Sequence, residues 1–202
     1  MSLNSTSLVE KACQGNQAAF NKLVNLWYQR VYNFCFNYFS DHDRAMEATQ
    51  KTFIALHQHL PSLQKPNLFK SWLYRIAINF CHEEERKQKR RGWFFWNTTE
   101  KSGEGKTNTS WTSTLPNPEE ALQQQELASL LAKALKSLPE EQRVVVIMKE
   151  YEGLKFKEIA EVLKMSENTV KSRMYYGLKA LRKILEKWNI HQENIDYGAQ
   201  TR

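Results

Sequence analysis

The stretch that decides the fold is residues 156–174, FKEIAEVLKMSENTVKSRM, which has the pattern of two short helices joined by a tight turn. Three apolar residues have the spacing of one buried helix face: Ile159, Val162 and Leu163. Ser166 is a preferred N-cap for a second helix, and Val170 and Met174 return that helix to the same core. The pattern predicts a helix-turn-helix, which places its second helix in the major groove of DNA.

The outward face of the predicted second helix is basic and rich in hydroxyl groups. Lysine bonds guanine acceptors, hydroxyls reach base edges or phosphates, and tyrosine packs on the thymine methyl group. These residue types could also simply solvate a surface helix, but the motif and the basic face occur together, which favours DNA binding. The candidate duplex-binding residues are Ser166, Thr169, Lys171, Ser172, Arg173, Tyr175, Tyr176 and Lys179.

The bulk composition agrees with a nucleic-acid partner. The 202 residues carry a net charge of +7, and only 7 glycines and 5 prolines interrupt them, which favours long helices. The three cysteines are isolated from one another, which fits a reducing cytoplasm and supports neither a disulfide framework nor a zinc finger. We see no signal peptide and no apolar run long enough to insert into a membrane, so we expect a cytoplasmic protein.

The whole chain is predicted to be all-α, with two small helical domains joined by a flexible linker. Residues 1–92 form a four-helix domain, with a first helix that starts at the Ser7–Glu10 capping box and later helices over 17–38, 41–60 and 67–91. Residues 93–116 are the linker because most of them are polar and cannot bury a core. Residues 117–190 hold the helix-turn-helix, and 191–202 are a frayed tail. The aromatic residues 93–96 either fold back on the first domain or form a docking patch.

The fourth predicted helix carries a second nucleic-acid signal. Arg75, Asn79, His82 and Arg86 form one polar stripe, and five of the six residues 86–91 are cationic. A basic run can follow a phosphate backbone, and nearby aromatic residues fit the capture of bases from a single strand. Trp72 is equally well explained as a core anchor. The candidate single-strand residues are Trp72, Arg75, Asn79, Arg86, Lys87, Lys89 and Arg90.

Nothing in the sequence predicts an enzyme, a metal site or a cofactor. The five histidines lack metal-binding spacing, and neither a glycine-rich phosphate loop nor a nucleophile elbow is present. A regulator that binds duplex DNA through the helix-turn-helix alone stays open as an alternative, although it leaves the first domain unexplained. A protein that binds the membrane surface through the basic helix end is a further alternative, although the matching long amphipathic face is missing.

Several segments together resemble bacterial sigma factors of the extracytoplasmic-function (ECF) type. They are residues 44–53 (RAMEATQKTF), 69–79 (FKSWLYRIAIN), 138–143 (LPEEQR), 152–154 (EGL) and 169–173 (TVKSR). The resemblance runs from about Ala18 to Leu185, in the family's order and with a linker where the family has one. It implies a non-enzymatic subunit that directs promoter-specific initiation by core RNA polymerase.

The resemblance also implies roles for the candidate residues. Glu47, Gln50 and Phe53 would bind core polymerase through its beta-prime subunit, with the beta subunit as a further contact. The helix-turn-helix would bind the duplex minus-thirty-five element, and the fourth helix would bind the melted minus-ten element. The loop from Pro61 to Lys70, with Asn79 behind it, would capture a flipped base. An anti-sigma factor is a further implied partner.

The sequence departs from the family pattern at several positions. Met46 and Lys51 stand where the family often has carboxylates, and Tyr175 and Tyr176 stand where a basic residue is frequent. Lys164 replaces a frequent turn glycine, and we expect this to cost about 1 kcal/mol if the backbone there is left-handed.

Overall fold

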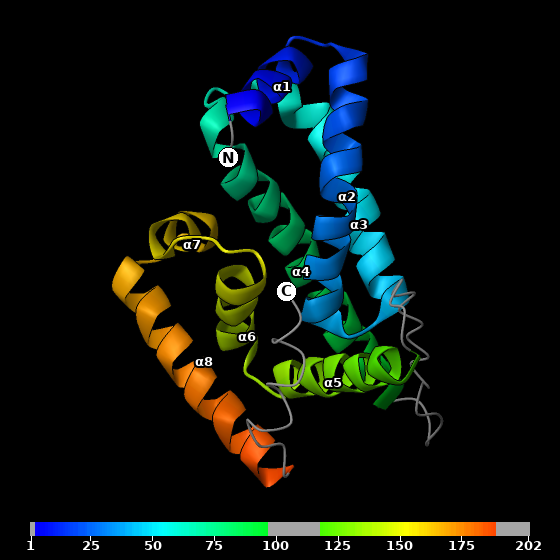
Figure 1. The fold of residues 1–202 in the computed structure, drawn as a ribbon, viewed down its shortest axis with the longest axis vertical. Coiled ribbons are helices and arrows are strands. Elements are labelled where there is room, and N and C mark those ends of the chain that lie inside the picture. Colours follow the sequence, from blue (N-terminus) through cyan, green and yellow to red (C-terminus); the bar gives the residue numbers. More distant parts are fainter. Residues whose placement is uncertain (1–2, 97–117, 189–202) are drawn as a thin grey trace.

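The computed structural model describes residues 3–96 and 118–188, and within these ranges the chain is built of helices (Figure 1). The first bundle consists of α1 (Leu3–Cys13), α2 (Gln17–Phe39), α3 (His42–His59) and α4 (Phe69–Trp96), with the short 3-10 turns η1 (Leu60–Ser62) and η2 (Pro66–Leu68) between the last two. The second bundle consists of α5 (Pro118–Lys136), α6 (Glu140–Val146), the π-helical turn η3 (Ile147–Tyr151), α7 (Phe156–Leu163) and α8 (Glu167–Lys187). The predicted all-α fold is confirmed.

Side-chain caps fix where the long helices of the first bundle begin. The Asn16 side chain accepts a hydrogen bond from the Ala19 N–H at 2.9 Å, at the start of α2. Asp41 does the same for Arg44 at 3.0 Å, at the start of α3. Each cap satisfies one of the N–H groups that the first helical turn leaves without a partner. The turn between α2 and α3 can therefore be short.

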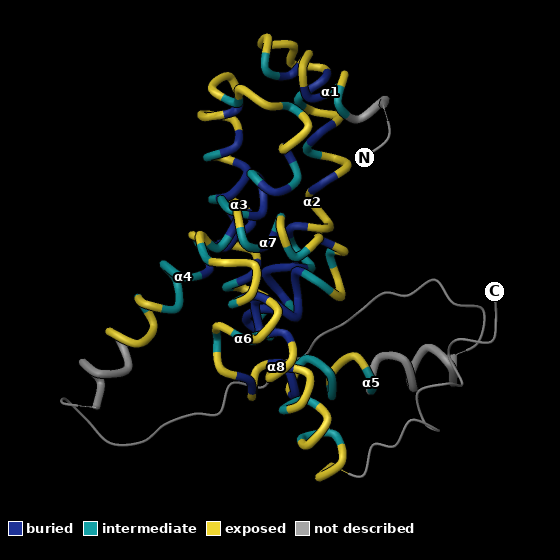
Figure 2. The backbone as a smooth tube through the Cα atoms, turned by 90° about the vertical axis from the view of Figure 1, so that its left-hand side faces the viewer, coloured by how far each residue is buried: buried dark blue, intermediate teal, exposed yellow. Residues whose placement is uncertain are grey.

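Aromatic side chains pack together in the centre of the first bundle, where Figure 2 colours stretches of the backbone as buried. Trp27 of α2 meets the edges of Phe69 and Tyr74 of α4, with ring centroids 5.7 and 6.3 Å apart. Phe34 packs on Tyr74 from the other side at 5.3 Å. Such edge-to-face pairs add to the hydrophobic gain from burial. These contacts fix the rotation of α4 about its own axis.

The second bundle depends on a close approach of α8 to α6. Gly177 is buried in α8, and a Cβ atom at that position would lie only 3.0 Å from the Cγ2 of Val146. Five hydrophobic residues of α6 and η3 are buried in the core: Val144, Val145, Val146, Ile147 and Met148. The absence of a side chain at Gly177 therefore lets the long α8 lie close against α6.

The predicted helix-turn-helix is confirmed as α7 and α8. Glu158 accepts a hydrogen bond from the Lys155 N–H at 2.7 Å and so caps the start of α7. Lys164 ends α7 in the left-handed conformation, with φ 54° and ψ 48°. The Met165 N–H then donates to the Ala160 carbonyl at 3.0 Å, which turns the chain into α8. The backbone at Lys164 is thus left-handed, which is the condition under which we expected the missing turn glycine to carry a cost.

The structure differs from the predicted boundaries in two places. The helix α1 begins at Leu3, so Ser7 and Glu10 lie inside it rather than at its start. The helix α4 continues to Trp96 and takes in residues 93–96, which we assigned to the start of the linker. The rest of the predicted linker and the predicted tail lie outside the described residues.

The left-handed turn gives a first prediction. Replacing Lys164 by glycine should raise the free energy of unfolding by about 1 kcal/mol, because a side chain in this conformation carries a steric cost that glycine avoids. Chemical denaturation followed by circular dichroism measures the change.

The matched control is Lys157→Gly, an exposed lysine within the same helix α7. That change should not raise the free energy of unfolding, because Lys157 already has ordinary right-handed geometry and glycine there only lowers the helix propensity. Equal destabilisation by both glycines would contradict the account of the turn.

Candidate nucleic-acid interface

The outer face of α8 is open to solvent and carries most of the residues predicted to contact duplex DNA. Tyr175 and Tyr176 are 62% and 57% exposed, and their rings meet edge to face at 5.4 Å. The remaining exposed members of this face are Lys171, Ser172 and Lys179. The Ser166 hydroxyl caps the helix by accepting from the Thr169 N–H at 3.1 Å. The helix start and its outer face therefore lie on one accessible surface.

Arg173 differs from the other predicted duplex-binding residues because it is held within its own bundle. One guanidinium nitrogen pairs with Glu141 of α6 at 2.5 Å, and another contacts the Met165 sulfur at 3.2 Å. Lys171 has a looser partner, the exposed Glu167 one turn before it at 2.7 Å. Surface pairs of that kind contribute little and exchange readily for a phosphate. Arg173 therefore supports the turn between α7 and α8, whereas the amino group of Lys171 is available to contact DNA.

The loop before α4 forms a pocket of about 260 Å³ beside Trp72. Its lining residues are Ser62, Leu63, Gln64, Lys65, Leu68, Ser71, Trp72, Arg75 and Glu161. Trp72 is half-buried and packs against Phe69 with ring centroids 6.4 Å apart, so it serves the core and the pocket wall together. A pocket of this size with an aromatic wall is suited to a stacked base.

Asn79 lies away from this loop pocket. It is exposed on α4 and lines a second pocket of about 350 Å³ between α4 and the helix-turn-helix, together with Arg75 and His82. We expected Asn79 to lie behind the loop that captures the base. The structure instead places it in the second pocket. Arg75 lines both pockets and connects them.

The basic end of α4 is less cationic than its sequence suggests. Lys87 pairs with Glu83 at 2.8 Å and lies 3.9 Å from Glu84. The guanidinium of Arg86 donates to the His82 carbonyl at 3.2 Å, while Arg90 is exposed. Residues 83–85 are three consecutive glutamates directly before the basic run, so this neutralisation could have been foreseen from the sequence.

The second bundle contacts this surface of α4 directly. The Arg75 guanidinium donates to the Glu161 carbonyl of α7 at 2.7 Å. Lys70 donates to the Glu152 carbonyl at 2.5 Å, and the Tyr74 hydroxyl donates to the Glu152 carboxylate. Burial between the bundles raises the pKa of Glu152 and lowers the pKa of the Lys70 amino group. Each bundle thus satisfies polar groups of the other.

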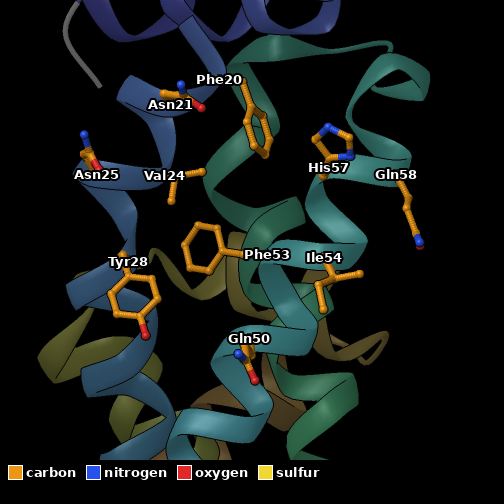
Figure 3. Close-up of a pocket in the computed structure, with 10 residues that line it drawn as sticks. All are labelled: Phe20, Asn21, Val24, Asn25, Tyr28, Gln50, Phe53, Ile54, His57 and Gln58. Atoms are coloured by element: carbon orange, nitrogen blue, oxygen red, sulfur yellow. The ribbon is translucent and has the colours of Figure 1, made fainter. Parts of the chain in front are cut away.

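A second apolar surface lies between α2 and α3, on the first bundle alone. A groove of about 500 Å³ lies there. Figure 3 draws the residues that line it, which are Phe20, Asn21, Val24, Asn25, Tyr28, Gln50, Phe53, Ile54, His57 and Gln58. Tyr28 stacks on Phe53 with ring centroids 5.5 Å apart, and Ile54 is 56% exposed. Gln50 and Phe53 were predicted as partner-binding residues, and Glu47 lies one turn before the groove and pairs with Lys51 at 2.5 Å.

The sequence reasoning missed the α2 wall of this groove. Val24 is only half-buried and faces the groove, although its spacing from Trp27 and Val31 is that of a buried helix face. Tyr28 and Ile54 were not selected, although both are apolar residues that fall outside the buried stripe of their helix. Exposed apolar residues that gather on one surface indicate a docking site.

Metal and membrane sites can be assessed over the described residues. Residues 3–96 and 118–188 contain no group of three or more metal-ligating side chains. No helix in the same ranges is both long and apolar enough to span a bilayer.

Two family models match the chain, one on each bundle. The model "Sigma-70 region 2" matches residues 23–91, which include α3 and most of α2 and α4. The model "Sigma-70, region 4" matches residues 128–181, which include the helix-turn-helix. Together the two models match more than half of the 202 residues.

Curated proteins match over nearly the whole length. The ECF RNA polymerase sigma factor SigW of Bacillus subtilis is 29% identical over 178 residues, which is 88% of this chain and 94% of that protein. The ECF RNA polymerase sigma-E factor of Escherichia coli K12 is 29% identical over 174 residues, which is 86% of this chain and 90% of that protein. The RNA polymerase sigma-H factor of Pseudomonas aeruginosa is 27% identical over 179 residues, which is 89% of this chain and 92% of that protein.

Two solved structures share the fold. The sigma factor RpoE in complex with the anti-sigma factor NepR, from Bartonella quintana, superposes with a TM-score of 0.66 at 21% identity, covering 83% of this chain and 96% of that one. CnrH in complex with the cytosolic domain of CnrY superposes with a TM-score of 0.65 at 21% identity, covering 91% and 97%.

The cap of α8 gives a second prediction. Replacing Ser166 by alanine should lower the free energy of unfolding by about 1 kcal/mol, because the Thr169 N–H loses its acceptor. Replacing it by aspartate should be nearly neutral for stability, since aspartate caps equally well. Thermal unfolding of the three proteins measures both effects. Equal losses for alanine and aspartate would exclude the cap as the cause.

Proposed function

Because the chain belongs to the sigma-70 factors of the ECF type, we propose that it binds core RNA polymerase through the groove between α2 and α3 and reads promoters through α8 and α4. It acts by binding rather than by catalysis. The observation that carries the proposal is the placement of an accessible DNA-binding helix on one bundle and an aromatic-walled pocket with a basic helix on the other. A DNA-binding regulator that works without polymerase needs only the first of these.

The outer face of α8 is proposed to read the duplex minus-thirty-five element. Residues near the N-terminus of a recognition helix reach base edges, so Lys171 and Ser172 are assigned to bases. Tyr175 and Tyr176 lie about one turn further along and present rings that can pack on thymine methyl groups. Lys179, another turn on, is assigned to a phosphate. Arg173 acts by holding the turn against Glu141.

The pocket beside Trp72 is proposed to accept a base of the melted minus-ten element. Lys65 and Arg75 at its rim supply positive charge for the flanking phosphates. The strand then follows α4 past Asn79 toward the exposed Arg86, Lys89 and Arg90. Lys87 contributes less because two glutamates neutralise it.

The groove between α2 and α3 is proposed to bind a helical segment of the beta-prime subunit. An apolar groove bordered by amide groups suits an amphipathic helix, which inserts apolar anchors and bonds at the edge. Val24, Tyr28 and Ile54 extend the surface formed by Gln50 and Phe53. Glu47 lies one turn of α3 before Gln50 and adds a carboxylate beside the groove.

An anti-sigma factor is proposed as a further partner. We also propose that the chain contacts the beta subunit of polymerase and that it is located in the cytoplasm. Support for an inhibitor comes from the two structural relatives, since RpoE is in complex with the anti-sigma factor NepR and CnrH with the cytosolic domain of CnrY.

Run-off transcription tests the proposed function. Purified core polymerase with this protein should initiate at discrete sites on a pool of genomic promoter fragments, and these sites should share two spaced upstream elements. Lys171→Ala and Trp72→Ala should reduce the yield. Duplex binding without any polymerase-dependent initiation would instead establish the simple regulator.

The two lysines of α8 give a third prediction, measured as affinity for duplexes that contain the minus-thirty-five element. Lys171→Ala should cost about 1–3 kcal/mol and relax the sequence preference at one position, because it removes a base contact. Lys179→Ala should weaken all duplexes alike and reduce the salt dependence by about one counterion. Identical behaviour of the two variants would contradict these assignments.

The groove gives a fourth prediction, measured as affinity for core polymerase by fluorescence polarisation. Ile54→Asp should weaken binding at least about tenfold, because it places a charge in an apolar contact. Leu26→Asp is the matched control: Leu26 is 59% exposed, compared with 56% for Ile54, and is not among the groove residues. Both variants should fold, since neither side chain is buried. Equal losses in the two variants would remove the groove as the binding site.

A further inference from the structure

Two adjacent tyrosines project from the middle of α8, which lies at the edge of the molecule in Figure 1. Tyr175 is 62% exposed and Tyr176 is 57% exposed, although a large aromatic side chain gains free energy when it leaves water. Neither hydroxyl makes a hydrogen bond to another described residue. The packing of the second bundle therefore does not explain these two side chains, and a ligand that covers them would gain apolar contact.

The two rings form one continuous surface across the outer face of α8. Because successive residues lie about 100° apart around a helix, Tyr175 and Tyr176 flank the line directly opposite the buried residues Val170, Met174 and Gly177. The ring centroids are 5.4 Å apart and the ring planes are inclined at 73°, which is an edge-to-face contact. The rings therefore meet over the centre of the outer face. We call this pair the tyrosine ridge (Tyr175 and Tyr176).

The residues that border the tyrosine ridge along α8 suit DNA rather than an apolar protein surface. Lys171 and Ser172 lie one turn before the ridge, Lys179 lies one turn after it, and all three are exposed. Lysines at both ends would attract phosphates and would hold the aromatic carbon between them against base edges in the major groove.

The base edge that fits an aromatic surface is the one that carries a methyl group. In the major groove of unmodified DNA, the apolar group among the base edges is the C5-methyl group of thymine. A cytosine that is methylated at C5 presents a methyl group at the same place. The two pyrimidines differ at C4, where thymine has an acceptor oxygen and cytosine has an amino donor.

A tyrosine tolerates this difference at C4, whereas a lysine does not. The phenol hydroxyl can donate a hydrogen bond to the thymine oxygen or accept one from the cytosine amino group. An ammonium group only donates, so it cannot bond the cytosine amino group. The methyl group is therefore the feature of a pyrimidine to which the tyrosine ridge responds most strongly.

We propose that the tyrosine ridge reads the C5-methyl group of pyrimidines, so that the chain distinguishes 5-methylcytosine from cytosine in duplex DNA. Methylation of a cytosine that faces the ridge then strengthens binding, and loss of the methyl group from thymine weakens it. The inference rests on the proposed function of α8 in reading duplex DNA, and it adds a modified base to the ligands of that surface.

The tyrosine ridge predicts a distinctive order of affinities. Burial of one methyl group corresponds to about a fourfold change in the dissociation constant. Thymine should therefore bind about fourfold more tightly than deoxyuridine, and 5-methylcytosine about fourfold more tightly than cytosine. Reading through the group at C4 would instead make thymine equal to deoxyuridine and 5-methylcytosine equal to cytosine.

Measurements with base analogues test this order on the full-length chain. Selection of duplexes from a random pool supplies a preferred site without the use of polymerase, and fluorescence anisotropy then compares the two matched pairs at each pyrimidine of that site. The purine opposite is the same within each pair, so only the methyl group changes. We expect the fourfold effect of both pairs at one or two positions. Absence of either effect at every position, or failure to select any duplex, would overturn the proposal.

Substitutions in α8 assign the effect to the tyrosine ridge. Tyr175→Ala and Tyr176→Ala should each abolish the methyl effect at one position, whereas the two phenylalanine variants should keep it because the ring surface remains. Tyr151→Ala is the matched control, since Tyr151 is a 47% exposed tyrosine on η3, and it should leave all four affinities unchanged. A methyl effect that survives both alanine variants would assign the reading to other residues and would overturn the proposal.

Failure of the proposed function gives a different result from failure of this inference. Run-off transcription needs no modified base, so initiation at discrete promoters without any methyl effect would contradict the tyrosine ridge alone. A methyl effect in the duplexes without initiation would support the ridge in a regulator that works without polymerase.

Discussion

The burial of one face of α4 is the constraint on which the rest of the structure depends. Leu73, Tyr74, Ala77, Ile78 and Cys81 are all essentially inaccessible, and aromatic contacts from α2 fix the helix rotation. Because successive residues are separated by about 100° around a helix, burying this face determines where Arg75 and Asn79 point. The same packing places Trp72 at the border between the core and the loop pocket.

Charge is distributed less simply than the total of +7 suggests. The acidic residues lie where they pair with cations of α4 or fix its contact with the second bundle, as Glu83 does with Lys87 and Glu140 does with Lys89. Burial of Glu140 would raise its pKa, but hydrogen bonds from Tyr38 and Lys89 outweigh it and the pKa is lowered, so the carboxylate stays charged near neutral pH. Burial lowers the pKa of His82, which keeps that side chain largely neutral there. The contact between the bundles therefore includes an ionised Glu140 that pairs with Lys89 at 3.2 Å.

Local sequence was sufficient to place most of the helices and the helix-turn-helix, although not the start of α1 or the end of α4. Caps such as Ser166 act within one turn, and Lys164 is left-handed at the position where the family frequently has a turn glycine. Features that depend on distant residues could not be predicted in this way. The engagement of Arg173 by Glu141 and the separation of Asn79 from the loop pocket both follow from tertiary packing. The α2 wall of the groove was missed because its residues share a helix with the buried stripe, and periodicity does not separate a core face from a docking face.

Capture of the melted minus-ten strand by α4 and its loop pocket is the central claim, and permanganate footprinting of unpaired thymines tests it most directly. Holoenzyme formed with this chain should make thymines around the minus-ten element reactive, and Trp72→Ala with Arg75→Ala should abolish that reactivity while leaving protection of the minus-thirty-five element intact. Duplex protection without any reactive thymines in the wild-type complex would contradict the claim that α4 and its loop pocket capture a melted strand.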